Sequence, residues 1–348
     1  MSERQLYQYN NRFELEIGGY FPELTLAYHT YGELSPDKSN VIWVCHALTA
    51  NADPEEWWPG MVGEGCYFDP KKYFIVCANM LGSCYGSTGP LSINSETEKP
   101  YYLTFPEVTI RDMVRAYDLL RKHLGIRKIN TVIGGSCGGH QALEMVLLQP
   151  DLIENLIVCV SSATESAWSK AVHTTQRMAM EADATWGEED ENAAVKGMKA
   201  ARGIGLLTYR TIDAYIQTQS DENDEKLDNF KASSYIKYQG EKLAKRFNAY
   251  SYWYLSKALD THNVARGRSS IEKVLNSIKP RTLIISIDSD MLIPVSEQNI
   301  LAKNIPGAKH EIIHSDFGHD GFLIEFDKLS RELDKFFKRK EVLNMPRK

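Results

Sequence analysis

The chain has 348 residues, of which 43% are hydrophobic and 25% are charged, and its formal net charge is −6. This composition is typical of a globular protein that is long enough to bury one large core or two smaller ones. An acidic chain without a basic stripe of interleaved aromatic residues gives little support to a nucleic-acid-binding function.

The first residues, Met1–Gln5, carry charge where a signal peptide needs an apolar run, and no window is long and apolar enough to span a membrane. We therefore expect a cytoplasmic protein that does not bind membranes. The six cysteines show no Cys-x-x-Cys pairing, so we expect neither disulfides nor a metal site; they are Cys45, Cys66, Cys77, Cys84, Cys137 and Cys159.

Short β-rich runs alternate with turns and amphipathic stretches up to about residue 163. The predicted strands are Val41–Cys45, Tyr73–Ala78, Thr131–Ile133 and Leu156–Val160. This alternation indicates βαβ units around a mostly parallel sheet. Before them, Phe13–Ile17 and Leu24–His29 are separated by Gly18 and Gly19, which predicts an antiparallel hairpin at the edge of the sheet.

From about Thr164 to Gly267 the strand pattern gives way to helix-forming segments, interrupted by the polar run Ser220–Lys226. The strand pattern returns in Arg281–Ile287 and Lys309–Ile313, and Phe322–Lys338 is predicted to be a closing helix.

The sequence therefore predicts an α/β fold with two domains. Residues 1–163 and 271–348 form the core domain, and residues 164–270 form a helical domain inserted into it. An insertion of this kind is best explained as a lid over an active site.

A Gly-x-Ser-x-Gly pattern lies at Gly134, Ser136 and Gly138. Alone it is a weak motif, but a β-branched strand runs into it and a helix-forming segment, Gln141–Leu148, follows. This is the strand, sharp turn and helix that expose a nucleophilic serine in α/β-hydrolase folds, where the glycines leave room for the turn. Ser136 is the predicted nucleophile, and the alternative is a Gly-rich turn with a buried serine.

A serine hydroxyl needs a base to remove its proton, and in this fold the chain order is serine, acid, histidine. Asp288 and Asp290 both follow a predicted strand, so either could be the acid. His319 lies in the loop after the next strand, and His314, at the end of that strand, is the rival base. The residues alone leave both choices open.

An oxyanion hole needs the backbone N–H that follows the nucleophile and a second N–H from the loop after an earlier strand. Cys137 supplies the first, and Leu48, just after the strand Val41–Cys45, is the predicted second donor. His46 in the same loop could be catalytic, although a histidine that leaves a central strand is more often a hydrogen-bonded anchor of its loop.

Seven segments of the chain carry a family resemblance: Cys45–Thr49, Asn79–Pro90, Phe105–Asp112, Gly134–Gly139, Leu207–Arg210, Ser289–Pro294 and Gly318–Leu323. Through them the sequence resembles, over nearly the whole chain, the homoserine O-acetyltransferase family of methionine biosynthesis, whose members have the α/β-hydrolase fold. It implies that Asp290 and His319 complete a triad with Ser136.

The resemblance also implies substrate contacts. Arg202 would bind the carboxylate of homoserine, with Tyr209 beside it, and Asp320 would bind the ammonium group. Arg202 and Tyr209 are seven residues apart, so on a helix they share one face. For a lid-helix arginine such as Arg202, a surface salt bridge is the alternative.

The reaction implied is transfer of an acetyl group from acetyl-CoA to the hydroxyl of L-homoserine by a ping-pong mechanism, with acetyl-CoA as a substrate and no cofactor. A succinyl donor, L-serine as acceptor, or an esterase reaction are the alternatives within this class, and a non-catalytic ligand-binding protein is the alternative outside it.

Two residues depart from the family pattern, Cys137 where methionine is usual and Asn248 where aspartate is common. The exchange at Cys137 leaves the acyl-chain preference open. The family also implies a homodimer formed through the lid helices. The aromatic run Tyr250–Tyr254 could lie in that interface or form a buried core within the lid.

Overall fold

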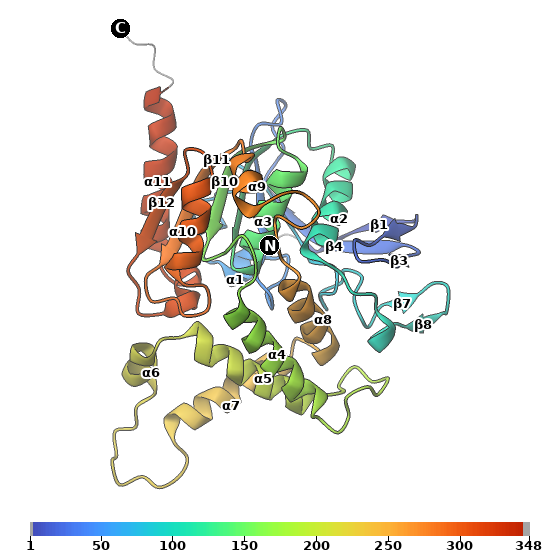
Figure 1. Ribbon diagram of the computed structural model, residues 1–348, viewed down its shortest axis with the longest axis vertical. Helices are drawn as coiled ribbons and strands as arrows, with labels where there is room; N and C mark the ends of the chain where they lie inside the picture. The colour runs from blue at the N-terminus through green and yellow to red at the C-terminus, as the bar shows by residue number, and fades with distance from the viewer. Residues whose placement is uncertain (1–2, 344–348) are drawn as a thin grey trace.

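The computed structural model describes residues 3–343, which are built around one eight-stranded sheet (Figure 1). The strand order is β1-β4-β6-β5-β9-β10-β11-β12. Of these eight strands, β4 alone runs opposite to the others. The strands are β1 (Gln5–Tyr9), β4 (Leu24–Tyr31), β5 (Val41–Cys45), β6 (Phe74–Ala78), β9 (Ile129–Gly135), β10 (Ile153–Cys159), β11 (Arg281–Ile287) and β12 (Lys309–Ile313).

Helices cover both faces of the sheet because its central strands are apolar on both sides. In β5, Trp43 packs toward the helix α2, with its ring 6.0 Å from that of Tyr117. Ile42 and Val44 belong instead to the cluster that contains Leu329 and Leu333 of α11. The first face carries α2 (Ile110–His123), α3 (Cys137–Leu148), α9 (Ile271–Asn276) and α10 (Val295–Asn304), and the second carries α1 (Pro54–Trp57) and α11 (Phe326–Leu343).

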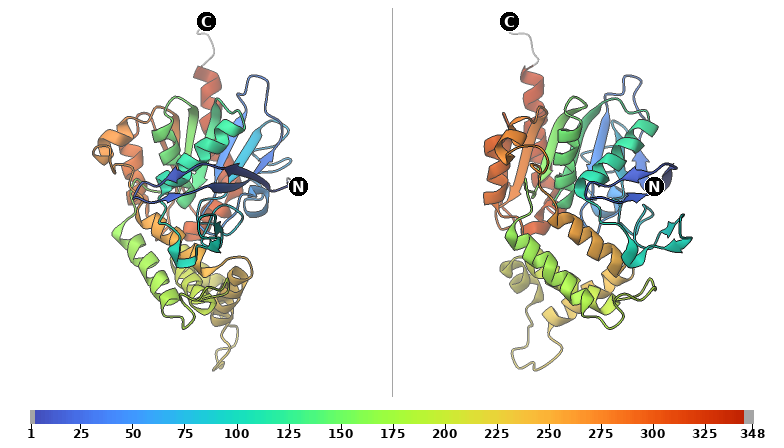
Figure 2. Two further views of the ribbon diagram at one scale, coloured as in Figure 1. Left: turned by 90° about the vertical axis from the view of Figure 1, so that its right-hand side faces the viewer. Right: turned by 45° about the vertical axis from the view of Figure 1, so that its right-hand side comes forward.

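Five of the six helices between β10 and β11 lie beyond the carboxyl ends of the parallel strands (Figures 1 and 2). They are α4 (Ala167–Glu181), α5 (Val195–Tyr209), α6 (Ile212–Gln219), α7 (Lys231–Ala244) and α8 (Ala249–Asp260). The two ends of this segment meet in a β-bridge between Thr164 and Asn263. The helical character predicted from Thr164 to Gly267 is confirmed, and the polar run Ser220–Lys226 lies in the loop between α6 and α7.

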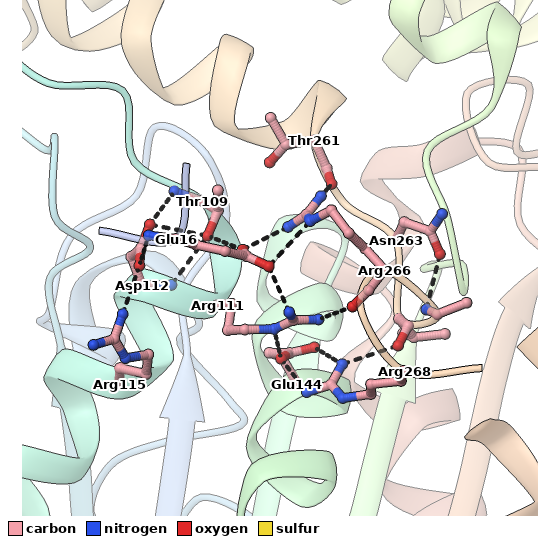
Figure 3. A network of polar contacts seen from close by, with 12 residues as sticks. Glu16, Thr109, Arg111, Asp112, Arg115, Glu144, Thr261, Asn263, Arg266 and Arg268 are labelled. Carbon is pink, nitrogen blue, oxygen red and sulfur yellow. Dashed lines mark hydrogen bonds and ion pairs between the residues drawn. The ribbon is translucent and has the colours of Figure 1, made fainter. Parts of the chain in front are cut away.

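A network of partly buried charges anchors the end of this helical segment to the core (Figure 3). Arg111 of α2 bridges Glu16 and Glu144, at 2.5 and 2.7 Å, and Glu144 belongs to α3, the helix that follows Ser136. Arg266 pairs with Glu16 and Arg268 pairs with Glu144. Each carboxylate is shared by two guanidinium groups, and these ion pairs between three arginines and two glutamates fix the segment 261–268 against α2 and α3.

The hairpin predicted between Phe13–Ile17 and Leu24–His29 is wrong. Gly18 and Gly19 do form a turn, but it joins β2 (Phe13–Glu14) to β3 (Tyr20–Phe21) in a separate two-stranded sheet. β4 is buried on both faces and pairs instead with β6 and with β1, a strand that the prediction missed. β1 is a largely exposed edge strand in which Tyr7 and Tyr9 alone pack partly against the core, so its sequence carries no strong strand pattern.

The other predicted elements are present in the structure, although β9 extends two residues beyond each end of Thr131–Ile133 and β10 begins three residues before and ends one before Leu156–Val160. The bounds of β5, β11 and β12 are those predicted, and the closing helix α11 begins four residues later than predicted because η2 (Gly318–Leu323) forms a 3-10 helix before it. The remaining short elements are β7 (Ile93–Asn94), β8 (Lys99–Pro100) and η1 (Tyr102–Thr104). Among residues 3–343, none of the helices has the length and apolar character needed to cross a bilayer.

Candidate active site

Ser136 lies at a sharp turn between β9 and α3, with a backbone φ of 56° and ψ of −125°. Few non-glycine residues adopt this conformation, and it is held by close packing on both sides. A Cβ atom on Gly134 would lie 2.2 Å from the carbonyl oxygen of Gly138, and one on Gly138 would lie 2.1 Å from that of Cys45. Only glycine fits at these two positions, so the motif is required by the turn itself.

The structure brings Ser136, His319 and Asp290 together in one hydrogen-bonded chain. The Oγ of Ser136 is 2.8 Å from Nε2 of His319, and Nδ1 of His319 is 2.7 Å from Oδ2 of Asp290. The other carboxylate oxygen of Asp290 accepts hydrogen bonds from the backbone N–H groups of Leu292 and Ile293. A fully satisfied carboxylate holds the imidazole with its Nδ1 protonated, which leaves Nε2 able to accept the serine proton.

The charges around His319 favour its protonated form. Burial alone would lower the pKa of His319, but the nearby carboxylates, first that of Asp290, raise it above its usual value. The imidazolium that forms when Ser136 gives up its proton is therefore stabilised in place.

The rival residues form a separate pair. His314 is 2.6 Å from Asp288, and its side chain is 82% exposed, whereas that of His319 is 5% exposed. Neither His314 nor Asp288 lines the cavity that contains Ser136. His46 is also accounted for as a loop anchor: its Nε2 accepts a hydrogen bond from the N–H of Met80, and burial lowers its pKa to about 4.

Two backbone N–H groups are available as an oxyanion hole. Within residues 3–343, neither the N–H of Leu48 nor that of Cys137 donates a hydrogen bond. Cys137 is the first residue of α3, where a backbone N–H has no partner inside the helix. The loop that carries Leu48 is fixed by Gln141, whose amide donates to the carbonyl oxygen of His46 at 3.1 Å.

Ser136 and His319 line a cavity of about 380 Å³ between the core and the helical segment. Arg202, Tyr209 and Asp320 line it as well, so the structure brings the three predicted substrate residues to the predicted nucleophile. Arg202 and Tyr209 share a face of α5, with the guanidinium 5.8 Å from the centre of the Tyr209 ring. No carboxylate pairs with Arg202 in the described part of the chain, which argues against a salt-bridge role.

Several residues at this cavity were missed by the sequence prediction. Nε of Arg210 donates to Oδ2 of Asp320 at 2.8 Å and so links the end of α5 to the loop that carries His319. His173 of α4 lines the cavity and is almost fully buried, while Lys242 and Arg246 lie at its exposed mouth. Arg210 belongs to Leu207–Arg210, a segment that carries the family resemblance, so the sequence could have indicated it. The positions of His173, Lys242 and Arg246 depend on how the helices pack.

The two departures from the family pattern have simple structural outcomes. The side chain of Cys137 is buried, with its sulfur 3.6 Å from that of Met80, so it packs behind the turn. Asn248 caps the N-terminus of α8 by accepting the N–H of Ser251 at 2.8 Å, as an aspartate would. In the aromatic run, Tyr250, Tyr252 and Tyr254 are each at most 5% exposed, so these side chains are buried within the single chain.

A serine at a strained turn after a central strand is characteristic of α/β-hydrolase-fold enzymes when it is hydrogen-bonded to a histidine that is held in turn by an aspartate, both from later loops. Residues 40–326 match the family model for the alpha/beta hydrolase fold.

A homoserine O-acetyltransferase of Cyclobacterium marinum is 49% identical over 334 residues, which cover 96% of this chain and 95% of that protein. That of Chlorobaculum parvum is 46% identical, with coverages of 93% and 92%. The crystal structure of homoserine O-acetyltransferase from Bacillus anthracis superposes with a TM-score of 0.87 at 25% identity, covering 97% of each chain. The chain belongs to the homoserine O-acetyltransferase family.

The raised pKa of His319 predicts the pH dependence of the enzyme. Ser136 can pass its proton only to neutral His319, so the rate of turnover should fall as the pH drops through that pKa, above the usual value of about 6.5. Asp290→Asn removes the charge that raises the pKa of His319, so the low-pH decline of the pH–rate profile (its acid limb) should move to lower pH. The maximal rate should also fall by up to about 10⁴.

Asp288→Asn is the matched control, because it alters the exposed pair with His314 and should leave both the limb and the rate unchanged. An acid limb at the same pH in Asp290→Asn and the parent enzyme would show that His319 does not govern it.

Proposed function

We propose that this enzyme transfers an acetyl group from acetyl-CoA to the hydroxyl of L-homoserine through an acyl-enzyme on Ser136, and so acts in methionine biosynthesis. One observation carries the proposal: the hydrogen-bonded chain of Ser136, His319 and Asp290 opens into the same cavity as an arginine without an ion-pair partner. A nucleophile and an anion-binding group in one cavity suit an acyl acceptor that carries a carboxylate.

In the first half-reaction, Nε2 of His319 takes the Ser136 proton while Oγ attacks the thioester carbonyl carbon. The oxyanion accepts hydrogen bonds from the N–H groups of Leu48 and Cys137. The carbon–sulfur bond then breaks, and His319 returns the proton to the departing thiolate. CoA leaves as the thiol, and the acetyl group stays on Ser136 as an ester.

In the second half-reaction, L-homoserine occupies the cavity with its carboxylate at Arg202 and Tyr209 and its ammonium at Asp320. Its hydroxyl gives its proton to His319 and attacks the acetyl carbon. Ser136 recovers the proton as its bond to the acetyl group breaks, and O-acetylhomoserine leaves. The ion pair with Arg210 keeps the Asp320 carboxylate oriented, which supports this use of it.

Water competes with homoserine for the acetyl-enzyme, so the site must be enclosed. The segment 164–270 would serve as the lid domain on the core formed by residues 1–163 and 271–348. Its helices contribute His173, Arg202 and Tyr209 to the walls of the cavity. A lid that both binds the acceptor and excludes water favours transfer over hydrolysis.

The acceptor assignment predicts that Arg202→Ala and Asp320→Ala separate the two half-reactions. Each loses a charge-assisted hydrogen bond worth about 1.5–3 kcal/mol, so kcat/KM for homoserine should fall by about one to two powers of ten. The pre-steady-state release of CoA thiol should survive, because acylation does not involve these groups.

The assay should use acetyl-CoA and succinyl-CoA, each with L-homoserine, L-serine or no acceptor. Parallel double-reciprocal lines with acetyl-CoA and homoserine are the expected ping-pong result. A preference for succinyl-CoA or L-serine, or thiol release at the same rate without acceptor, would point instead to a succinyltransferase, a serine acyltransferase or an esterase.

The mouth of the cavity supports a donor that carries phosphate groups. Lys242 and Arg246 are exposed there, and neither has a carboxylate partner within residues 3–343. The guanidinium of Arg246 is fixed by hydrogen bonds of 2.5 Å to the carbonyl oxygen of Thr49 and the hydroxyl of Tyr85. Although Glu56 shares the mouth, two unpaired cations outnumber it, so we propose that they bind the phosphates of acetyl-CoA.

This proposal predicts that Lys242→Glu raises the KM for acetyl-CoA by about tenfold at low ionic strength, with a smaller effect in high salt. S-acetyl-N-acetylcysteamine has the same thioester without phosphates, so its KM should not change. Lys245→Glu adds the same charge beside the site without lining the cavity and serves as the control. An equal effect on both donors would contradict a phosphate contact.

We also propose that the protein forms a homodimer through the lid helices. The tyrosines of the aromatic run are buried, but Ile212 and Ile216 of α6 and Tyr238 of α7 are 60–71% exposed. Light scattering should give twice the mass of the chain, and Ile212→Asp combined with Ile216→Asp should give the monomer. A parent protein that is monomeric at assay concentration would exclude this dimer.

A further inference from the structure

His173 of α4 is a buried histidine that lines the cavity of Ser136 and has no part in the mechanism described above. Its Nδ1 lies 2.9 Å from Oδ1 of Asp260 on the neighbouring helix α8. Nη2 of Arg177 holds the other oxygen of Asp260 at 2.5 Å. In the tautomer that donates its Nδ1 proton to this carboxylate, the ring is fixed and its lone pair lies on Nε2.

Nε2 of His173 has no hydrogen-bond partner within residues 3–343. The buried carboxylate of Glu165, eight residues before His173, does not bond to this nitrogen. Its Oε2 lies 3.6 Å from Nε2 of His140 and makes no hydrogen bond. Nε2 of His173 is not among the fully buried side-chain atoms that lack a partner, so this atom of a cavity-lining residue is accessible from the cavity. A ligand N–H or O–H in the cavity would satisfy it.

We infer that Nε2 of His173 accepts a hydrogen bond from the ammonium group of the amino-acid acceptor. The inference rests on the proposed function and adds a recognition residue to it. The acceptor offers a carboxylate, a hydroxyl and an ammonium; Arg202 suits the first, and His319 takes the proton of the second. The ammonium is the remaining donor, and its three N–H groups need more than one acceptor.

Asp320 alone does not meet that need, because its Oδ2 is already bonded to Arg210. A second acceptor on α4 would bind the ammonium from another direction. Two acceptors on different elements would orient the α-carbon of the amino acid and so favour one stereoisomer. His173 is thus a specificity-determining residue: it selects an acceptor with an amino group and leaves the attack of Ser136 on the donor unaffected.

The test compares two acceptors that differ only in the ammonium, L-homoserine and 4-hydroxybutanoate, with acetyl-CoA as donor. Acetyl ester formation is followed by mass spectrometry, which detects slow transfer to the poorer acceptor. For His173→Phe, which keeps a ring without nitrogen, kcat/KM for homoserine should fall about 10- to 100-fold. The value for 4-hydroxybutanoate should stay within about twofold, and the thiol burst with acetyl-CoA alone should be unchanged.

Two further variants make the result specific. His173→Gln keeps an acceptor oxygen and should recover part of the homoserine activity. His314→Phe removes the exposed histidine of the pair with Asp288, outside the cavity, and should change nothing.

The inference is overturned if His173→Phe lowers kcat/KM equally for both acceptors, or if it leaves kcat/KM for homoserine unchanged. It is also overturned if both His173 variants lose the thiol burst. A parent enzyme that shows the burst but transfers nothing to homoserine would instead overturn the proposed function.

Discussion

The close approach of α3 to β5 is the constraint on which the site depends. Gly138 lies so near the carbonyl group of Cys45 that no side chain fits between them, and this contact forces Ser136 into its left-handed conformation. The same contact places the N–H of Cys137 beside the loop of Leu48, so one packing event sets both the nucleophile and the proposed oxyanion hole. The strain at Ser136 is offset by the apolar core on both faces of the sheet.

Electrostatics then separate His319 from the other buried histidines. His140, four residues after Ser136, stacks on His262 with their rings 3.9 Å apart. Burial lowers the pKa of His140 well below its usual value and that of His262 to about 4, so both are neutral packing groups. The raised pKa of His319 means that a proton taken from Ser136 is held at that ring. In the proposed mechanism, the proton therefore moves only between His319 and the groups that react with it, and not to His140 or His262.

The sequence was informative where local chemistry determines structure. A β-branched strand followed by Gly-x-Ser-x-Gly dictates a sharp turn. The order of the later strands left two candidate acids and two candidate bases, and the family resemblance selected Asp290 and His319. The apolar segment of β4 was recognised as a strand, but its partner β1 was not. β4 is buried on both faces, so its own sequence does not show which strands lie beside it. The position of His173 likewise depends on how α4 packs against α8, which no spacing in the sequence encodes.

The most direct test of the account is whether the acetyl group resides on Ser136 between the two half-reactions. The purified protein would be mixed with acetyl-CoA alone, quenched in acid, digested and analysed by mass spectrometry, with a second sample chased by L-homoserine before the quench. We expect one acetyl group on the peptide that carries Ser136, which disappears in the chase as O-acetylhomoserine forms. An unmodified Ser136 peptide in rapidly quenched samples, under conditions of full homoserine-dependent turnover, would contradict the acyl-enzyme and require direct transfer between two bound substrates.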